Sequence, residues 1–216
     1  MVYRLGGNKV NYLTIALDDG YESWDEAGHI LEKYGWRGTF YTCLRNVVHN
    51  RNNKRQRMFP PTDVITWKEV LSLHKRGHEI ANHGTRHSDL PHCNNRELKL
   101  ELLDSKEVFN SYGIPVTTYG CAFNSYPTDF PALALKHYNS FRLSLGVNNT
   151  SPKKTYHVLP PVDALNEVST GSGKWIVSAW HDVKHDGFTK YLNTVKELNI
   201  EVLTVKQVYE NKEKKQ

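Results

Sequence analysis

The stretch Tyr12-Leu-Thr-Ile-Ala-Leu-Asp-Asp-Gly20 decides the fold class of this chain. Its first six residues form an almost purely apolar run, which is typical of a strand buried on both faces in a parallel sheet. Asp18 and Asp19 follow where that strand ends, and two buried acids are costly unless their charge is used. Both carboxylates reach one pocket only if the chain bends, as Gly20 permits; the alternative is a solvated Asp-Gly turn.

Strand-like and helix-like segments alternate along the rest of the chain. We predict strands at 12–17, 38–43, 78–81, 115–119, 141–145, 156–159, 175–180 and 200–203. Helices are predicted at 24–34, 67–76, 95–112, 132–137, 188–199 and 205–213, with Ser23, Thr66 and Thr204 as N-caps and a loop at 46–61. This alternation predicts one α/β domain over residues 1–216, a closed or nearly closed (β/α) barrel of about seven strands with its functional residues at the strand ends.

Composition narrows the class of protein. The chain has 216 residues, 38% of them hydrophobic and 24% charged, which fits a globular enzyme rather than a fibrous or disordered protein. The net charge is +5, but the basic segments 51–57 and 212–215 carry no interleaved aromatic residues, so we expect no nucleic-acid partner. Three cysteines without a Cys-x-x-Cys pair predict neither a disulfide framework nor a thiolate zinc site.

The chain as written shows no targeting or membrane signal. No run of about 18 apolar residues is present, so no membrane segment is expected. The first eight residues have no apolar signal core. These observations favour a cytoplasmic protein, or the trimmed catalytic domain of an extracellular or wall-associated one.

Two groups of histidines follow predicted strands. His83 and His87 are four residues apart in a loop after a short strand, where two imidazoles can converge on one metal ion. His-x-x-x-His spacing occurs elsewhere in the chain, so the position after a strand is what distinguishes this pair. His181 ends a late apolar strand and is either a catalytic acid or base or a structural histidine. Trp180 beside it is either a stacking platform for a sugar or a core residue.

Together these pieces resemble the polysaccharide deacetylase family, also called the NodB-homology domain or carbohydrate esterase family four. The resemblance rests on Leu13-Thr-Ile-Ala-Leu-Asp-Asp-Gly-Tyr21, on Gly77-His-Glu-Ile-Ala-Asn-His-Gly-Thr-Arg-His-Ser-Asp-Leu90, and on Trp180-His-Asp182. It implies a distorted NodB-like (β/α) barrel. It also implies one divalent metal ion, zinc first and cobalt, nickel or manganese next, held by Asp19, His83 and His87. Asp18 would be the general base and His181 the general acid.

The chain departs from the family pattern in two places. The stretch Tyr119-Gly-Cys-Ala-Phe-Asn124 matches the third motif but lacks its arginine, and has Ala122 for a proline and Asn124 for a glycine. By resemblance the backbone N–H of Phe123 would face the oxyanion. Asp163 is a candidate for the fourth motif, and Arg142 is a candidate for the missing guanidinium.

The resemblance implies a metal-dependent hydrolase that removes N-acetyl groups from an N-acetylated sugar polymer or glycoconjugate. Phe123, Trp180 and Asp163 are the candidate substrate-binding residues. Two alternatives stay open. One is an O-acetyl esterase or a small cyclic-amide hydrolase on the same fold. The other is a metal-containing carbohydrate-binding protein without turnover.

Overall fold

The computed structural model describes residues 12–48, 64–145, 155–170, 175–183 and 186–213. Its strands are β1 Tyr12–Asp18, β2 Thr39–Thr42, β3 Glu79–Asn82, β4 Thr118–Gly120, β5 Ser140–Leu145, β6 Thr155–Val158, β7 Trp175–Trp180 and β8 Glu201–Val202. Its longer helices are α1 Trp24–Lys33, α3 Trp67–Lys75, α7 Pro161–Thr170, α8 Gly187–Glu197 and α9 Val205–Glu213. Shorter helices are α2 Leu44–Val48, α4 Asn95–Lys99, α5 Ser105–Ser111 and α6 Phe130–Ala134.

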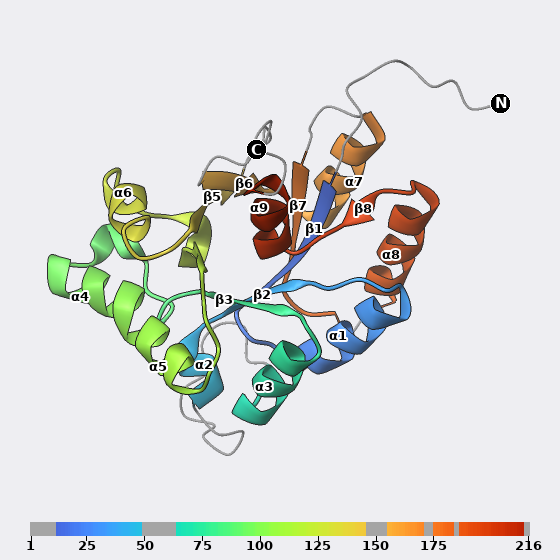
Figure 1. Ribbon diagram of the computed structural model, residues 1–216. Helices are drawn as coiled ribbons and strands as arrows, with labels where there is room; N and C mark the ends of the chain where they lie inside the picture. Colours follow the sequence, from blue (N-terminus) through green and yellow to red (C-terminus); the bar gives the residue numbers. More distant parts are fainter. Residues whose placement is uncertain (1–11, 49–63, 146–154, 171–174, 184–185, 214–216) are drawn as a thin grey trace.

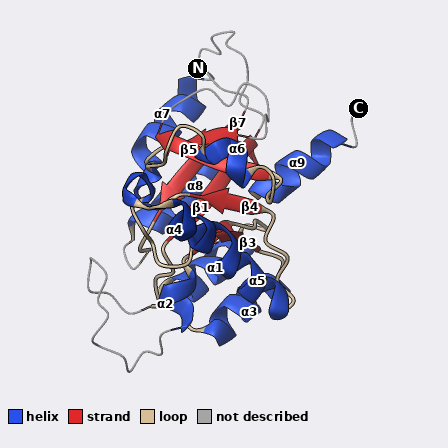
Figure 2. Ribbon diagram, turned by 90° about the vertical axis from the view of Figure 1, so that its left-hand side faces the viewer, coloured by secondary structure: helices blue, strands red, loops and turns tan. Residues whose placement is uncertain are grey.

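The strands form a nearly closed parallel barrel, as predicted. Their order is β6-β5-β4-β3-β2-β1-β7, and β8 pairs with the start of β1 beside β2. The ring is joined by a parallel bridge between Leu159 and Ser178, where Leu159 makes two backbone hydrogen bonds to the β7 strand. Figure 1 shows the strands surrounded by α1, α3, α5 and α8, and Figure 2 shows the same arrangement from the side.

Alternation along each strand separates two cores. On β1, Leu13, Ile15 and Leu17 face the surrounding helices, whereas Ala16 belongs to a second cluster inside the barrel. That inner cluster is rich in aromatic side chains. Its buried members are Ala16, Tyr41, Ala81, Tyr156, Val158, Trp175, Val177, Val205 and Val208. Since Asp18 lies two residues beyond Ala16, it shares the inward face of β1.

The last helix covers the barrel end at which the strands begin. Val205 and Val208 of α9 pack into the inner cluster. The buried carboxylate of Glu79, at the start of β3, accepts a hydrogen bond of 2.9 Å from the backbone N–H of Lys206 and another of 2.9 Å from the hydroxyl of Thr39. The strand ends that carry the predicted site residues therefore lie at the opposite, open end of the barrel.

Most of the predicted helices and strands are confirmed, and a few segments differ from the prediction. Thr66 forms a capping box with Glu69 at the start of α3, as predicted. Helix α7 was not predicted. The predicted helix 95–112 contains a π-helical turn at Leu100–Asp104 between α4 and α5. Part of the predicted loop 46–61 forms the end of α2, and the rest, with the basic segment 51–57, lies outside the described residues. No helix in the described ranges has the length and apolarity needed to span a membrane.

Candidate active site

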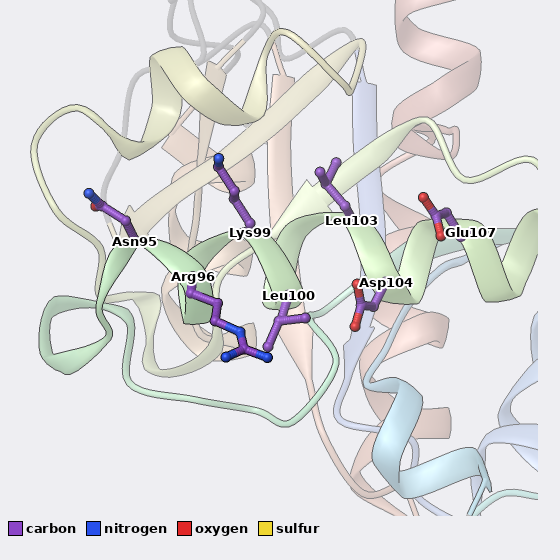
Figure 3. Close-up of a pocket in the computed structure, with 7 residues that line it drawn as sticks. All are labelled: Asn95, Arg96, Lys99, Leu100, Leu103, Asp104 and Glu107. Carbon is purple, nitrogen blue, oxygen red and sulfur yellow. The ribbon is translucent and has the colours of Figure 1, made fainter.

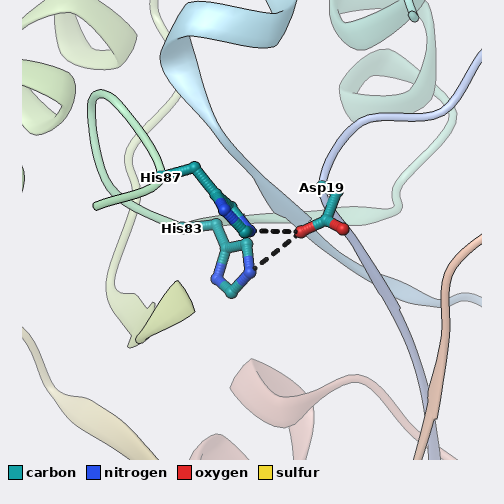
Figure 4. Close-up of side chains that lie close together, drawn as sticks. All are labelled: Asp19, His83 and His87. Carbon is teal, nitrogen blue, oxygen red and sulfur yellow. Dashed lines mark hydrogen bonds and ion pairs between the residues drawn. The ribbon is translucent and has the colours of Figure 1, made fainter. Parts of the chain in front are cut away.

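Three predicted ligands meet at the open end of the barrel. Asp19 directly follows β1, and His83 and His87 lie in the loop after β3. Nε2 of His87 is 2.8 Å and Nε2 of His83 is 3.2 Å from Oδ1 of Asp19 (Figure 4). Burial alone would raise the pKa of Asp19, but hydrogen bonds and positive charge from the two histidines outweigh it and hold that pKa well below its usual range. The carboxylate is therefore ionised.

Unfavourable backbone conformations gather around these side chains. Five residues other than glycine have a positive φ in the described part of the chain, and four of them lie here: Asp19 at 82°, His87 at 61°, Phe123 at 56° and Asn124 at 51°. Such conformations cost free energy and persist where the surrounding structure holds them, commonly at functional sites. The predicted bend at Gly20 is present, since Gly20 has a φ of 95°, and it includes Asp19 as well.

The ring of His83 is oriented by a backbone carbonyl. Its side chain is 2% exposed, and its Nδ1 donates to the carbonyl oxygen of Gly120 over 2.7 Å. That bond requires a proton on Nδ1, so Nε2, the ring nitrogen that faces Asp19, is the atom that would bind an ion. Metal-ligating histidines are generally fixed in this way, so the pair of rings and the carboxylate fit a divalent cation. The three donor atoms lie within 4.8 Å of one another, and no second group of this kind occurs among the described residues.

Asp18 is paired with a buried arginine inside the barrel mouth. Nη1 of Arg142, on β5, lies 2.6 Å from Oδ1 of Asp18, and the two side chains are 1% and 6% exposed. The guanidinium also lies over the ring of Tyr41, 4.3 Å from its centre. Burial alone would lower the pKa of Arg142, but the charge of Asp18 outweighs it and keeps the pKa above its ordinary value. The two side chains thus form a buried ion pair.

Gly120 makes room for this arginine. Gly120 and Arg142 are partners in the β4–β5 register. A Cβ atom at position 120 would lie 2.9 Å from Nε of Arg142 and equally close to the ring of Tyr41. The stretch 119–124 lacks the arginine expected from the resemblance, and the next strand places a guanidinium against Asp18 instead.

His181 reaches the same site from the end of β7. Its Nε2 lies 3.8 Å from Oδ2 of Asp19, and its side chain is 57% exposed. Its backbone carbonyl accepts a hydrogen bond of 3.3 Å from Nε1 of Trp24, and the hydroxyl of Ser23 donates to Asp182 over 2.5 Å. The prediction that Ser23 caps α1 is therefore wrong, because its side chain makes no cap hydrogen bond and instead ties the start of α1 to the segment carrying His181.

Phe123 and Asp163, two of the candidate substrate-binding residues, lie in different surroundings. Phe123 is 62% exposed, and its ring lies edge-on to that of His87, 4.7 Å between centres. An exposed aromatic ring thus borders His87, one of the three predicted ligands. Asp163 is exposed in the first turn of α7 and makes no ion pair with Arg142. Its predicted role stays a prediction.

Trp180 packs into the protein. It is half-buried, and its ring lies edge-on to Phe188 and Tyr191 of α8, at 4.9 and 5.0 Å. Its indole N–H donates to the hydroxyl of Ser178 over 3.0 Å. These contacts favour the core interpretation of Trp180 over the sugar platform.

A surface hollow lies away from these residues. It is lined by seven side chains between Asn95 and Glu107, along the outer side of α4 and α5 (Figure 3). None of the predicted site residues lines it.

The chain belongs to the polysaccharide deacetylase family, whose model matches residues 6–139. Members of the family are deacetylases and esterases, so membership supports a hydrolase of this kind. A search of curated proteins found no match.

Solved structures share the fold at low sequence identity. A chitin deacetylase from the fungal pathogen Colletotrichum lindemuthianum is 17% identical, with a TM-score of 0.65 over 94% of this chain and 88% of that one. A family 4 acetyl xylan esterase from Clostridium thermocellum, in complex with a cobalt ion, is 18% identical, with a TM-score of 0.61 over 94% and 92%. A family pseudoenzyme from Bacillus anthracis is 14% identical, with a TM-score of 0.62 over 94% and 66%. Active and inactive proteins thus share this fold.

Proposed function

We propose that the chain is a metal-dependent hydrolase that removes N-acetyl groups from an N-acetylated sugar polymer or glycoconjugate. The observation that carries the proposal is the convergence of Asp19, His83 and His87 within 4.8 Å at the open end of the barrel. His181 and Phe123 border the same three side chains. Pure carbohydrate binding would not need this combination of ligands and acid.

Asp19, His83 and His87 would hold one divalent ion, leaving positions for water and substrate. Two imidazoles and a carboxylate suit zinc first, and cobalt, nickel or manganese next. When bound, such an ion polarises a carbonyl group and lowers the pKa of water. His83 is already oriented for the role by its hydrogen bond to Gly120.

Asp18 is proposed as the general base. Its carboxylate lies beside Asp19 in sequence and is held by Arg142 over 2.6 Å. Because the guanidinium occupies one oxygen, the carboxylate is fixed in orientation and would take the proton of the attacking water. Arg142 is thus proposed to position the base rather than to touch the substrate.

Phe123 and His181 would complete the reaction on the other side of the acetyl group. The backbone N–H of Phe123 would donate to the oxygen that becomes negative as water adds. The departing amine cannot leave as an anion, so Nε2 of His181 would give it a proton. The exposed side chain of His181 is accessible to a substrate from solvent.

The test is acetate release from N-acetylglucosamine oligomers by the purified protein. We expect release with zinc or cobalt, loss after chelation, and recovery when the metal is returned. His87→Ala should weaken metal binding and turnover together. His92→Ala, at a side chain 83% exposed outside the site, is the matched control. Bound metal and bound sugar without any acetate would instead identify a non-catalytic carbohydrate-binding protein.

Hydrolysis of O-acetyl esters by the same residues is the second candidate. The acetyl xylan esterase among the proteins that share the fold favours this candidate, and an alkoxide leaves with less help from an acid than an amine does. For an esterase, His181→Ala should spare turnover of an O-acetylated sugar while reducing turnover of the N-acetylated one. Equal loss on the two substrates would count against the esterase.

A further inference from the structure

A buried carboxylate lies directly beneath the loop that carries the two histidines. Glu101 is 2% exposed. Its Oε2 accepts hydrogen bonds from the backbone N–H groups of Thr85 and Arg86, at 2.8 and 3.0 Å. Its Oε1 accepts from the N–H of Arg86 at 3.1 Å and from the hydroxyl of Ser88 at 2.8 Å. All three donor residues lie between His83 and His87 or directly after them.

The loop is shaped to receive this carboxylate. Gly84 has a φ of +87°, and a Cβ atom there would lie 2.5 Å from Oε2 of Glu101. A side chain at position 84 would therefore both strain the backbone and displace the carboxylate. The hydroxyl of Thr85 adds a bond of 2.7 Å to the carbonyl oxygen of Leu100, next to Glu101.

The segment that supplies Glu101 is irregular. Leu100–Asp104 is a π-helical turn within an otherwise α-helical stretch, a feature that is rare and often found at functional sites. Side chains bond to backbone carbonyls along it, from Thr85 to Leu100 and from Tyr138 to Leu102, the latter over 2.6 Å. The turn thus faces the loop with the carboxylate of Glu101 and the carbonyl oxygen of Leu100.

The loop needs such support. His87 has a φ of 61°, an unfavourable conformation that persists only where surrounding contacts determine it. His83 is fixed by Gly120, but the backbone between the two histidines is held by Glu101. Without it, the N–H groups of Thr85 and Arg86 would lose this acceptor.

We propose that Glu101 is the positioning residue of the His83–His87 loop, acting through backbone N–H groups to set the distance and orientation of the two imidazoles. It does not touch the substrate or the ion. The effect on metal affinity rests on the proposed function, whereas the effect on the loop does not. Reach and acceptor geometry, rather than negative charge, are what the loop requires.

Three variants separate reach from charge. Glu101→Gln keeps the length: its carbonyl oxygen can accept from Thr85 and Arg86 while its amide donates to Ser88. Glu101→Asp keeps the charge but is one methylene too short. Glu101→Leu removes both acceptor oxygens. Glu107→Leu, the same change at an exposed position of the same helical stretch (Figure 3), is the matched control.

The first measurement is the metal dissociation constant, by competition of zinc or cobalt with a chromophoric chelator. We expect binding weakened about 10–100-fold in Glu101→Leu and Glu101→Asp, the usual effect of losing an outer hydrogen-bond partner. Glu101→Gln and Glu107→Leu should stay within about threefold of wild type. The reverse order, with Glu101→Asp unimpaired and Glu101→Gln impaired, would replace positioning by a charge effect and overturn the proposal.

The second measurement is amide hydrogen exchange in the metal-free protein. The amides of Thr85 and Arg86 should exchange faster in Glu101→Asp and Glu101→Leu, while that of Ile80 on β3 is unchanged. Unchanged exchange at both amides in a folded variant overturns the proposal. If Glu101→Leu does not fold, the comparison of Asp with Gln decides.

The two measurements keep this proposal apart from the proposed function. A wild-type protein that binds no metal would defeat the proposed metal site, and exchange at Thr85 and Arg86 would still decide the role of Glu101. Equal metal affinity in the wild type and in Glu101→Leu would defeat the role of Glu101 and leave the proposed metal site standing.

Discussion

Replacing Arg142 with methionine removes the cationic partner of Asp18 in the barrel mouth. The two side chains are almost fully buried and 2.6 Å apart, so each single change leaves a buried charge without its partner. We expect Arg142→Met and Asp18→Asn each to lower the free energy of unfolding by about 3–5 kcal/mol. The double variant should cost less than the sum by about 2–3 kcal/mol, because it buries no unpaired charge.

The cycle isolates the ion pair from other contacts of Arg142. The contact of its guanidinium with the Tyr41 ring is lost in both variants that lack the arginine, so it cancels. Nε of Arg142 is buried and has no hydrogen-bond partner among the described residues, and methionine relieves that cost in the same two variants. The measurement is urea unfolding at pH 7 of the wild type, both single variants and the double variant.

A half-exposed ion pair provides the control. Arg76 and Asp25 lie 2.9 Å apart with side chains 20% and 35% exposed, and the same cycle there should give a coupling below about 1 kcal/mol. Additive losses at Asp18 and Arg142, or a coupling no larger than that of the control, would refute the buried pair as the element that holds Asp18.

Three further results are expected. Burial lowers the pKa of His78 from 6.5 to about 4. Only the unfolded chain therefore binds a proton at His78 as the pH falls from 6.5 to 4, which lowers the free energy of unfolding by about 3 kcal/mol. In urea unfolding, His78→Gln should not show this loss. Burial raises the pKa of Glu79 above 4.5, so its contribution to stability is complete below pH 4.5 and is lost as the pH rises. Between pH 4 and 8, the free energy of unfolding of Glu79→Gln should therefore increase relative to that of the wild type. A constant difference between the two proteins would contradict this. Ser23→Ala should lower kcat on an N-acetylated sugar while the metal dissociation constant stays unchanged, because Ser23 supports the segment of His181; an equal loss of metal binding would contradict this.

Local sequence patterns predicted most of the helices and strands. The apolar run of β1 and the Thr66–Glu69 capping box are read within a few residues, and both elements lie where the sequence predicts them. Ser23 has the same local pattern, yet its hydroxyl bonds to Asp182, 159 residues away. A hydroxyl at a predicted N-cap can bond either to the N–H groups of its own helix or to a distant side chain, and the sequence does not show which bond forms.

Site residues that follow strands were predictable from the sequence itself, whereas among partners from distant elements only Arg142 was named, through the family resemblance. Asp19, His83 and His87 are brought together because parallel strands end at one edge of the barrel. Arg142 and Asp18 are 124 residues apart, and their contact depends on the β4–β5 register and on the space left by Gly120. Glu101 lies in a helical stretch, where its position resembles that of any polar helix residue, and only the π-helical turn directs it toward the loop.

The barrel has a weak join. In the described residues, Leu159 makes two backbone hydrogen bonds to the β7 strand, whereas β1 and β7 are in register over six residue pairs. The barrel should therefore open between β6 and β7 before it opens between β1 and β7, and the amide protons of Leu159 and Ala179 should reach deuterium equilibrium before those of β1. Strand β6 is the neighbour of β5, which carries Arg142, so this join lies one strand away from the cation that holds the proposed base.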